Sequence, residues 1–304
     1  MYAQKPFFAV SYEVWIRRIA VKRRYILLAL VLAVAIALFG AYLVLTQKLK
    51  DTTPPVITVA EELLEISVED ENDVLMTGIT AMDDRDGDVT ASLLVESVYG
   101  ITEDHVTTVT YAAFDRAGNV SKLQRKVRYT DYREPRFEFT GSLSFPHNSK
   151  FDLLDYVGAN DVLEGDIRRR VRATLVSDTR SIDELGSHVV RLQVTNSLGD
   201  TVEMDVPVEV YDPEWYLASV KLDTYLLYLK KGDVFNPREH LDKFVVRGDD
   251  TDISRGIPEG IDYEINGSVN TAVPGVYQVR YTLTKDLNLT SYTGQAYLIV
   301  VVQE

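Results

Sequence analysis

Residues 106–119 read VTTVTYAAFDRAGN, a stretch that leads from a β-strand into a tight turn. The first part, 106–111, is rich in β-branched and aromatic residues, which favour strands. The turn contains Gly118, and glycine is the residue that most readily adopts the positive φ that a hairpin turn needs. No helical pattern of useful length separates this stretch from similar strands at 189–194 (VVRLQV), 276–283 (VYQVRYTL) and 297–302 (YLIVVV). The region after residue 50 is therefore predicted to be all-β.

The pattern repeats with a period near 80 residues, and three landmarks recur in the same order: an opening Asp, a short acidic loop and a hairpin-turn residue. They lie at Asp51, 86–89 and Gly118; at Asp131, 164–167 and Gly199; and at Asp212, 250–253 and Asn288. Asparagine is the next best residue after glycine where φ is positive. We predict three tandem β-sandwich domains, at 47–131, 132–212 and 213–304.

The motifs of the first repeat resemble the bacterial surface immunoglobulin-like domains related to the Ig-like module of pesticidal crystal proteins. They are 54–57 (PPVI), 83–90 (DDRDGDVT) and 111–119 (YAAFDRAGN). The resemblance covers 51–131 and continues in reduced form through 132–212, while 229–235 (LKKGDVF) and 273–279 (VPGVYQV) are similar to related bacterial Ig-like repeats. It implies a two-sheet Ig-like β-sandwich per repeat, service as a spacer or binding module on exported proteins, and no catalytic residues.

A long apolar segment precedes the repeats. Residues 25–46 (YILLALVLAVAIALFGAYLVLT) carry no charge, and as a helix they would span roughly 30 Å, the thickness of a bilayer core. Five Lys or Arg lie in 17–24, against Lys48 and Lys50 after the segment, so the positive-inside rule places the N-terminus in the cytoplasm and the repeats outside the cell. The run is longer than a signal-peptide core, and no small-x-small cleavage pattern follows it. We therefore expect an uncleaved signal anchor, a single-pass transmembrane helix that alone holds the protein in the cell membrane.

Residues 1–24 form a basic, amphipathic cytoplasmic segment. Phe8, Tyr12, Trp15 and Ile19 recur at helical spacing beside basic residues, which predicts an interfacial helix leading into the membrane. A peptide that docks a cytoplasmic partner is the alternative.

Charge and cysteine content narrow the function classes. Residues 1–50 hold eight Lys or Arg and one Glu, whereas residues 51–304 hold 24 basic and 45 acidic side chains. So acidic an exported region argues against nucleic acid and anionic lipid as general partners. The absence of cysteine excludes disulfide scaffolds and thiol catalysis.

The acidic loop of the first repeat is the best candidate for chemistry. Asp83, Asp84, Asp86 and Asp88 offer clustered carboxylates, and calcium takes six to eight oxygen ligands. The alternative is a solvated turn in which Asp side chains cap backbone amides. The corresponding loop of the third repeat carries 249–252 (DDTD) and invites the same two interpretations. Calcium is the one cofactor that the sequence suggests.

A basic cluster, Arg168, Arg169, Arg170 and Arg172, stands out in the acidic region. Guanidinium groups suit phosphate and carboxylate, so an anionic wall polymer is a candidate ligand. The alternative is a solvated strand face whose arginines pair with neighbouring carboxylates.

Aromatic residues gather in the third repeat: Trp215, Tyr216, Tyr225, Tyr228 and Tyr292. They predict either a sugar-stacking platform or core packing and a domain junction. We expect no enzyme activity, because the four histidines are scattered without metal-ligand spacing and no nucleophile or phosphate-binding motif is present.

Three functions remain open. The first is an anchored cell-surface rod that serves as a spacer or adhesion module for a protein or cell-wall partner, since prolines near the repeat boundaries restrict the linkers. The second is a carbohydrate-binding module facing a wall glycan. The third is an accessory subunit of an envelope membrane complex, for which Ala33, Ala37 and Ala41 permit close helix packing.

Overall fold

The computed structural model describes residues 7–176, 181–214 and 216–304 of the chain. Its internal contacts define two compact units, each described by itself. The first comprises the chain up to Thr58 together with Ile79–Leu94 and Ala112–Lys122. The second comprises Val59–Gly78, Val95–Tyr111 and Leu123–Glu304.

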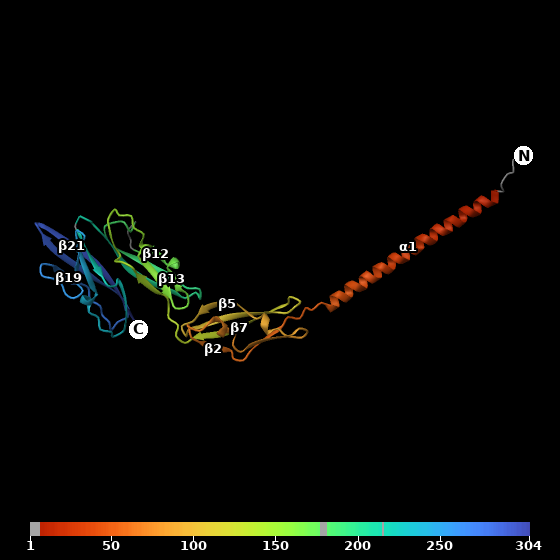
Figure 1. Cartoon of the computed structure of the whole chain (residues 1–304), viewed down its shortest axis with the longest axis horizontal. Helices are drawn as coiled ribbons and strands as arrows, with labels where there is room; N and C mark the ends of the chain where they lie inside the picture. Colours follow the sequence, from red (N-terminus) through yellow and green to blue (C-terminus); the bar gives the residue numbers. More distant parts are fainter. Residues whose placement is uncertain (1–6, 177–180, 215) are drawn as a thin grey trace. The chain divides into compact units, whose positions relative to one another are not determined.

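Helix α1 runs without interruption from Phe7 to Leu49 (Figure 1). The sequence predicted an interfacial helix within 1–24 followed by a span over 25–46, whereas the backbone forms one helix of 43 residues. It ends close to Pro54 and Pro55, which cannot continue a helix. Its segment Tyr25–Leu49 has a mean hydropathy of 2.8 and is long enough to cross a membrane, and every side chain in it is exposed. The predicted roles of Phe8, Tyr12, Trp15 and Ile19 concern side chains outside the described part.

In the described part of the β-region there are six sheets, two in each of three domains. Domain 1 consists of strands β1 Val56–Val59, β2 Leu63–Ile66, β3 Ile79–Asp83, β4 Gly87–Asp88, β5 Leu94–Ile101, β6 Val106–Phe114 and β7 Val120–Tyr129. Domain 2 consists of β8 Arg136–Phe139, β9 Ser144–Pro146, β10 Val157–Asp161, β11 Gly165–Asp166, β12 Arg172–Leu175, β13 Gly186–Thr195 and β14 Thr201–Tyr211. Domain 3 consists of β15 Ala218–Leu222, β16 Leu226–Lys230, β17 Leu241–Val246, β18 Asp249–Asp252, β19 Asp262–Asn266, β20 Gly275–Leu287 and β21 Thr290–Gln303.

Short 3₁₀ turns complete the described elements. They are η1 Asn72–Met76 and η2 Thr90–Ser92 in domain 1, η3 Leu153–Asp155 and η4 Arg168–Arg170 in domain 2, and η5 Pro237–His240 in domain 3.

All three domains share one strand topology. The first, third and fourth strands form a three-stranded sheet, and the second, seventh, sixth and fifth form a four-stranded sheet in that order. In each domain the second strand pairs in parallel with the seventh. In domains 2 and 3 the seventh strand also forms an antiparallel hairpin with the sixth. This repeated seven-stranded pattern confirms three tandem β-sandwich domains of immunoglobulin-like architecture behind one apolar helix.

The predicted turn residues adopt the predicted backbone. Gly118 and Gly199 have φ of 87° and 85° in the hairpins β6–β7 and β13–β14. In domain 3, Asn288 and Leu289 connect β20 to β21 with φ of 49° and 74°, so both residues of this two-residue turn are left-handed. Asn288 therefore adopts the left-handed backbone predicted for it, although its turn has two residues where the loops around Gly118 and Gly199 each have five.

Each sandwich buries alternate residues of its strands. Strand β3 alternates strictly between buried and exposed positions, and β6 buries Val109, Tyr111 and Ala113 completely. In domain 2 the same alternation on β13 and β14 fills a core that also receives Leu226 and Ile299 from domain 3. Domain 3 has its own core around Phe244, Tyr281 and Leu298. Domains 2 and 3, both within the second unit, therefore share part of one hydrophobic core.

Candidate metal centre

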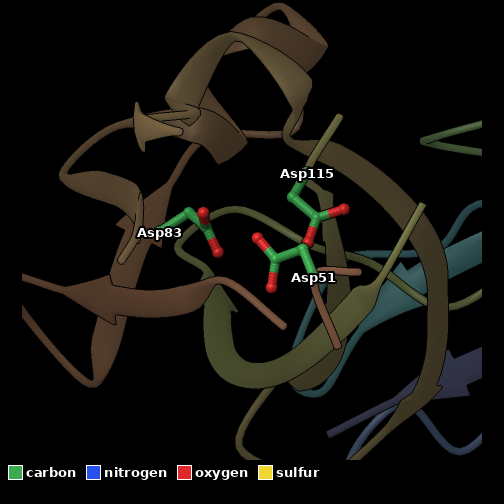
Figure 2. A group of neighbouring side chains, drawn as sticks. All are labelled: Asp51, Asp83 and Asp115. Atoms are coloured by element: carbon green, nitrogen blue, oxygen red, sulfur yellow. The ribbon is translucent and has the colours of Figure 1, made fainter. Parts of the chain in front are cut away.

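Three carboxylates converge at one end of domain 1, all within the first compact unit. Asp51 lies on the chain that enters the domain, Asp83 ends β3, and Asp115 directly follows β6. One oxygen of each lies within 4.8 Å of the others. Figure 2 shows the three side chains pointing toward one another from separate segments. The two-sheet topology explains the meeting, because the start of β1 and the ends of β3 and β6 reach the same end of the sandwich.

Asp83 is 7% exposed, and its two oxygens have different environments. Its Oδ1 accepts hydrogen bonds from the backbone N–H groups of Arg85 and Asp86, at 2.9 and 2.8 Å. Its Oδ2 is buried and has no hydrogen-bond partner among the described residues. A buried carboxylate oxygen without a partner is costly, so this atom calls for an electropositive group.

Asp115 is 9% exposed and is held by the turn that follows it. Its Oδ1 accepts from the Asn119 N–H at 2.7 Å, and its Oδ2 accepts from the Asn119 side-chain amide at 2.6 Å. Burial raises the pKa of Asp115, but hydrogen bonds from Asn119, Gly118 and Ala117 outweigh it and lower the pKa overall. The side chain is therefore an ionised carboxylate at neutral pH.

Asp51 is the third member and the one nearest a cationic side chain. Its Oδ1 accepts from the Thr53 N–H at 3.0 Å, and its Oδ2 lies 3.7 Å from Arg85 Nε. The Arg85 side chain is half exposed, and its Nη1 donates to the Leu49 carbonyl at 2.9 Å. Arg85 therefore lies at the edge of ion-pair distance from one carboxylate of the three.

This arrangement suits a hard cation. Calcium binds oxygens at about 2.3 to 2.6 Å, so two of its ligands lie at most about 5 Å apart. The three carboxylate oxygens meet that condition, and water or backbone carbonyls complete such a shell in other proteins. Asp51, Asp83 and Asp115 are the residues that would hold the ion.

Of the four predicted ligands, the structure brings only Asp83 into this cluster. Asp84 is exposed. Asp86 accepts from the Arg116 N–H at 2.7 Å, and Asp88 accepts from the Thr90 N–H at 2.9 Å. Hydrogen bonds from the Thr90 side chain and backbone lower the pKa of Asp88.

Asp88 has the same role as its counterparts in the other domains. Asp166 accepts from the Arg168 N–H at 3.0 Å, and Asp252 accepts from the Ser254 N–H at 2.9 Å. The capping interpretation of the recurrent acidic loop is thus confirmed at these positions. In the third repeat, Asp250 lies in the β17–β18 hairpin and forms an ion pair with Lys243 at 3.4 Å.

The arginine cluster lies on η4 and the start of β12, with all four side chains exposed. Arg168 pairs with Asp166 at 2.8 Å, and Arg170 makes a bidentate pair with Glu164. Among the described residues, two of the four guanidinium groups therefore have carboxylate partners, as the alternative interpretation expected. That interpretation also expected a strand face, whereas three of the four arginines lie on a 3₁₀ turn.

The aromatic residues of domain 3 do not form an exposed row in the described structure. Tyr225 and Tyr292 pack against the core of domain 3, and Tyr228 packs against that of domain 2. Tyr216 makes an edge-to-face contact with Tyr211 at 5.2 Å. Trp215 lies outside the described residues. These contacts support packing and a domain junction.

No family model and no curated protein matches the chain. Among solved structures, it is similar to Drosophila N-cadherin EC1-3 at 11% identity, covering 80% of this chain and 97% of that one, with a TM-score of 0.28. It is also similar to a Clostridium perfringens ZmpB structure described as CBM51-2 in complex with GlcNAc and INT domains. That match has 16% identity and a TM-score of 0.21, and it covers 51% of this chain and 41% of the other. The chain thus spans about two fifths of that relative's length, and the fold assignment rests on the sheets described above.

Proposed function

We propose that this protein is a membrane-anchored bacterial cell-surface protein. Helix segment Tyr25–Leu49 crosses the cell membrane once with the N-terminus in the cytoplasm, and the three Ig-like domains lie outside. The domains act as a spacer and interaction module for a protein or cell-wall partner. The resemblance of the repeats to bacterial surface Ig-like domains supports this role.

The observation that carries the proposal is the exposure of the apolar helix. All side chains of Tyr25–Leu49 are exposed, and none of its most apolar window is buried against the rest of the described chain. Such a surface is unfavourable in water, at roughly 25 cal/mol per Å² of apolar area. Lipid, or a neighbouring helix within lipid, is the environment that satisfies it.

The contact between domains 2 and 3 supports a mechanical or presenting role. The Phe137 N–H donates to the Tyr228 hydroxyl at 3.0 Å, and the guanidinium of Arg136 lies 5.0 Å from the centre of the Tyr228 ring. Arg136 also donates to Gln303 Oε1 at 2.7 Å. These contacts, with the shared core, fix the two domains against each other and favour a surface of constant geometry for a partner.

The anchor is tested with an epitope tag at each end of the full chain, expressed in bacterial cells. We expect both tags on one membrane-bound polypeptide that resists carbonate extraction. In intact spheroplasts, added protease should remove the C-terminal tag and spare the N-terminal one. A C-terminal tag recovered on a shorter, soluble product would identify a cleaved signal sequence and refute the anchor.

The partner is tested with the detergent-solubilised full chain, offered isolated wall sacculi and solubilised membrane proteins in parallel. Retention on sacculi that is lost at high salt, and lost in R169Q/R172Q, would favour an anionic wall polymer at the arginine cluster. Retention of one defined membrane protein, with clean sacculi, would favour an accessory subunit of an envelope complex. If the protein bound neither the sacculi nor a membrane protein, the interaction role would be contradicted and only the spacer role would remain.

A further inference from the structure

We infer that Asp51, Asp83 and Asp115 bind one divalent cation, calcium by its ligand chemistry, and that the ion ties together the three segments that carry them. This site differs from the loop predicted from sequence, with which it shares only Asp83.

The unpartnered oxygen of Asp83 is the first reason. Asp83 Oδ2 is buried without a partner among the described residues. It belongs to a side chain that is only 7% exposed and that points toward the carboxylates of Asp51 and Asp115 (Figure 2). Three negative groups gathered this closely repel one another unless a positive charge lies between them. A bound cation would coordinate the unpartnered oxygen and offset the repulsion among the three carboxylates.

Domain 2 contains the same corner in a form that needs no ion. Asp161 is equivalent to Asp83, since each ends the third strand and accepts two backbone N–H groups through Oδ1. Asn196 is equivalent to Asp115, since each follows the sixth strand and accepts the N–H four residues later. The Asn196 amide donates to Asp161 Oδ2 at 3.0 Å, and it also donates to the Tyr132 hydroxyl at 2.8 Å.

The domain 2 corner is complete because the Asn196 amide occupies the position of the Asp115 carboxylate and donates both to Asp161 and to the Tyr132 hydroxyl. The Tyr132 hydroxyl donates onward to Asp200 Oδ2 at 2.6 Å. Burial, followed by that hydrogen bond, raises the pKa of Tyr132, so its hydroxyl stays protonated. In domain 1 the amide donor is replaced by the Asp115 carboxylate, and the donor to Asp83 Oδ2 is missing. In domain 2 the Asn196 N–H group places a partial positive charge beside the buried carboxylate oxygen. In domain 1 another group must supply that charge.

Arg85 does not fill this role. Its Nε lies 3.7 Å from Asp51 Oδ2, its side chain is half exposed, and it also donates to the Leu49 carbonyl. It gives no hydrogen bond to Asp83 Oδ2. Arg85 therefore offsets part of the Asp51 charge and leaves the buried oxygen unsatisfied.

Calcium fits this donor set better than magnesium or a soft metal. The three ligands are carboxylate oxygens from three separated segments, and calcium accepts such irregular shells. Magnesium demands near-octahedral geometry and gives up its water reluctantly, and zinc or copper prefers nitrogen and sulfur.

The test uses the detergent-solubilised full chain, stripped of metal by a chelator and titrated with calcium in a calorimeter. We expect one ion per chain, with a Kd in the range of about 0.1 to 1 mM that is typical of extracellular calcium modules. Amide hydrogen exchange should slow in 51–58, 79–90 and 112–119. The matched peptides of domain 2, 157–167 and 195–201, should not respond.

Two variants remove the site by different routes. D83N takes away the charge of the buried ligand. D115N/N119D installs the Asn and Asp that domain 2 carries at 196 and 200, so that an amide can donate to Asp83 Oδ2 without metal. Both should weaken calcium binding at least tenfold, and D115N/N119D should keep its native exchange pattern in chelator, which separates loss of binding from loss of folding.

The matched controls are D84N and R85Q. D84N removes an exposed carboxylate from the same loop and should bind calcium like the wild type, whereas R85Q removes a competing cation and should bind at least as tightly. The proposal is overturned if no saturable binding occurs up to about 10 mM calcium. It is also overturned if D83N and D115N/N119D bind normally, or if D84N loses as much affinity as they do.

Discussion

The side-chain amide of Asn196 donates to Asp161 Oδ2 at 3.0 Å, whereas the carboxylate of the equivalent Asp115 lies within 4.8 Å of that of Asp83, whose Oδ2 has no partner among the described residues. Domains 1 and 2 thus share the same corner, but at one position domain 2 has a hydrogen-bond donor where domain 1 has a carboxylate. In domain 2 the hydrogen bonds of the corner are internal, so its contribution to stability is independent of metal.

N196D should therefore destabilise domain 2. The change replaces a buried donor with a carboxylate that faces Asp161, and the loss of one buried hydrogen bond alone costs about 1 to 3 kcal/mol. Hydrogen exchange of β10 and β13 under native conditions measures the effect. D200N is the control, because it keeps an acceptor for the Tyr132 hydroxyl. An unchanged exchange rate in N196D would show that Asn196 contributes little.

Glu164 should make the stability of domain 2 depend on pH in the acid range. Burial raises its pKa, but hydrogen bonds from the Ser197 N–H and from Arg170 outweigh it and lower the pKa below 4.5. A lowered pKa means that the stabilisation is full above about pH 4.5 and is lost as the pH falls through the folded-state value. E164Q should cost about 1 to 2 kcal/mol at pH 7. Urea unfolding followed by domain 2 exchange should show this difference shrinking toward pH 3. A difference that stays constant over that range would contradict the assignment.

The turn at Asn288 and Leu289 is strained at its second residue. Leu289 has φ of 74° and a fully exposed side chain, and a non-glycine residue in the left-handed region costs about 1 kcal/mol or more. L289G should therefore stabilise domain 3 by about 1 kcal/mol. G118A should do the opposite in domain 1. Gly118 has φ of 87°, and beyond its chain neighbours no described residue lies within 4 Å of an added Cβ, so the penalty is conformational. Thermal unfolding of both variants checks the pair, and a shift of the same sign in both would refute the argument.

The sequence predicted the features that are local along the chain. Gly118, Gly199 and Asn288 were recognisable because a tight turn imposes its φ requirement on one or two residues. The apolar helix was recognisable from a continuous run. The capping role of Asp88 was available as an alternative because it depends on an N–H only two residues away.

The cation cluster could not be read from spacing in the same way. Asp51 and Asp115 each lie 32 residues from Asp83, and they meet only in the folded sandwich, in which β1 and β3 belong to one sheet and β6 to the other. A signal did exist, because Asp51 and Asp115 lie in the opening and turn landmarks of the repeat. The domain junction was one of the two interpretations of the aromatic residues, and the contact of Tyr228 with Phe137 supports it.

The last prediction concerns two neighbours on β21 that face different cores. Ile299 is 1% exposed and belongs to the core of domain 2, whereas Leu298 is fully buried in the core of domain 3. Replacing either with alanine leaves a cavity and should cost about 2 to 4 kcal/mol. I299A should speed hydrogen exchange in β8 and β13 of domain 2, although the residue belongs to domain 3. L298A should speed exchange in β17 and β20 and leave domain 2 unchanged. If both variants affected only domain 3, the shared core would not couple the two domains, and a fixed geometry between them would lose its physical basis.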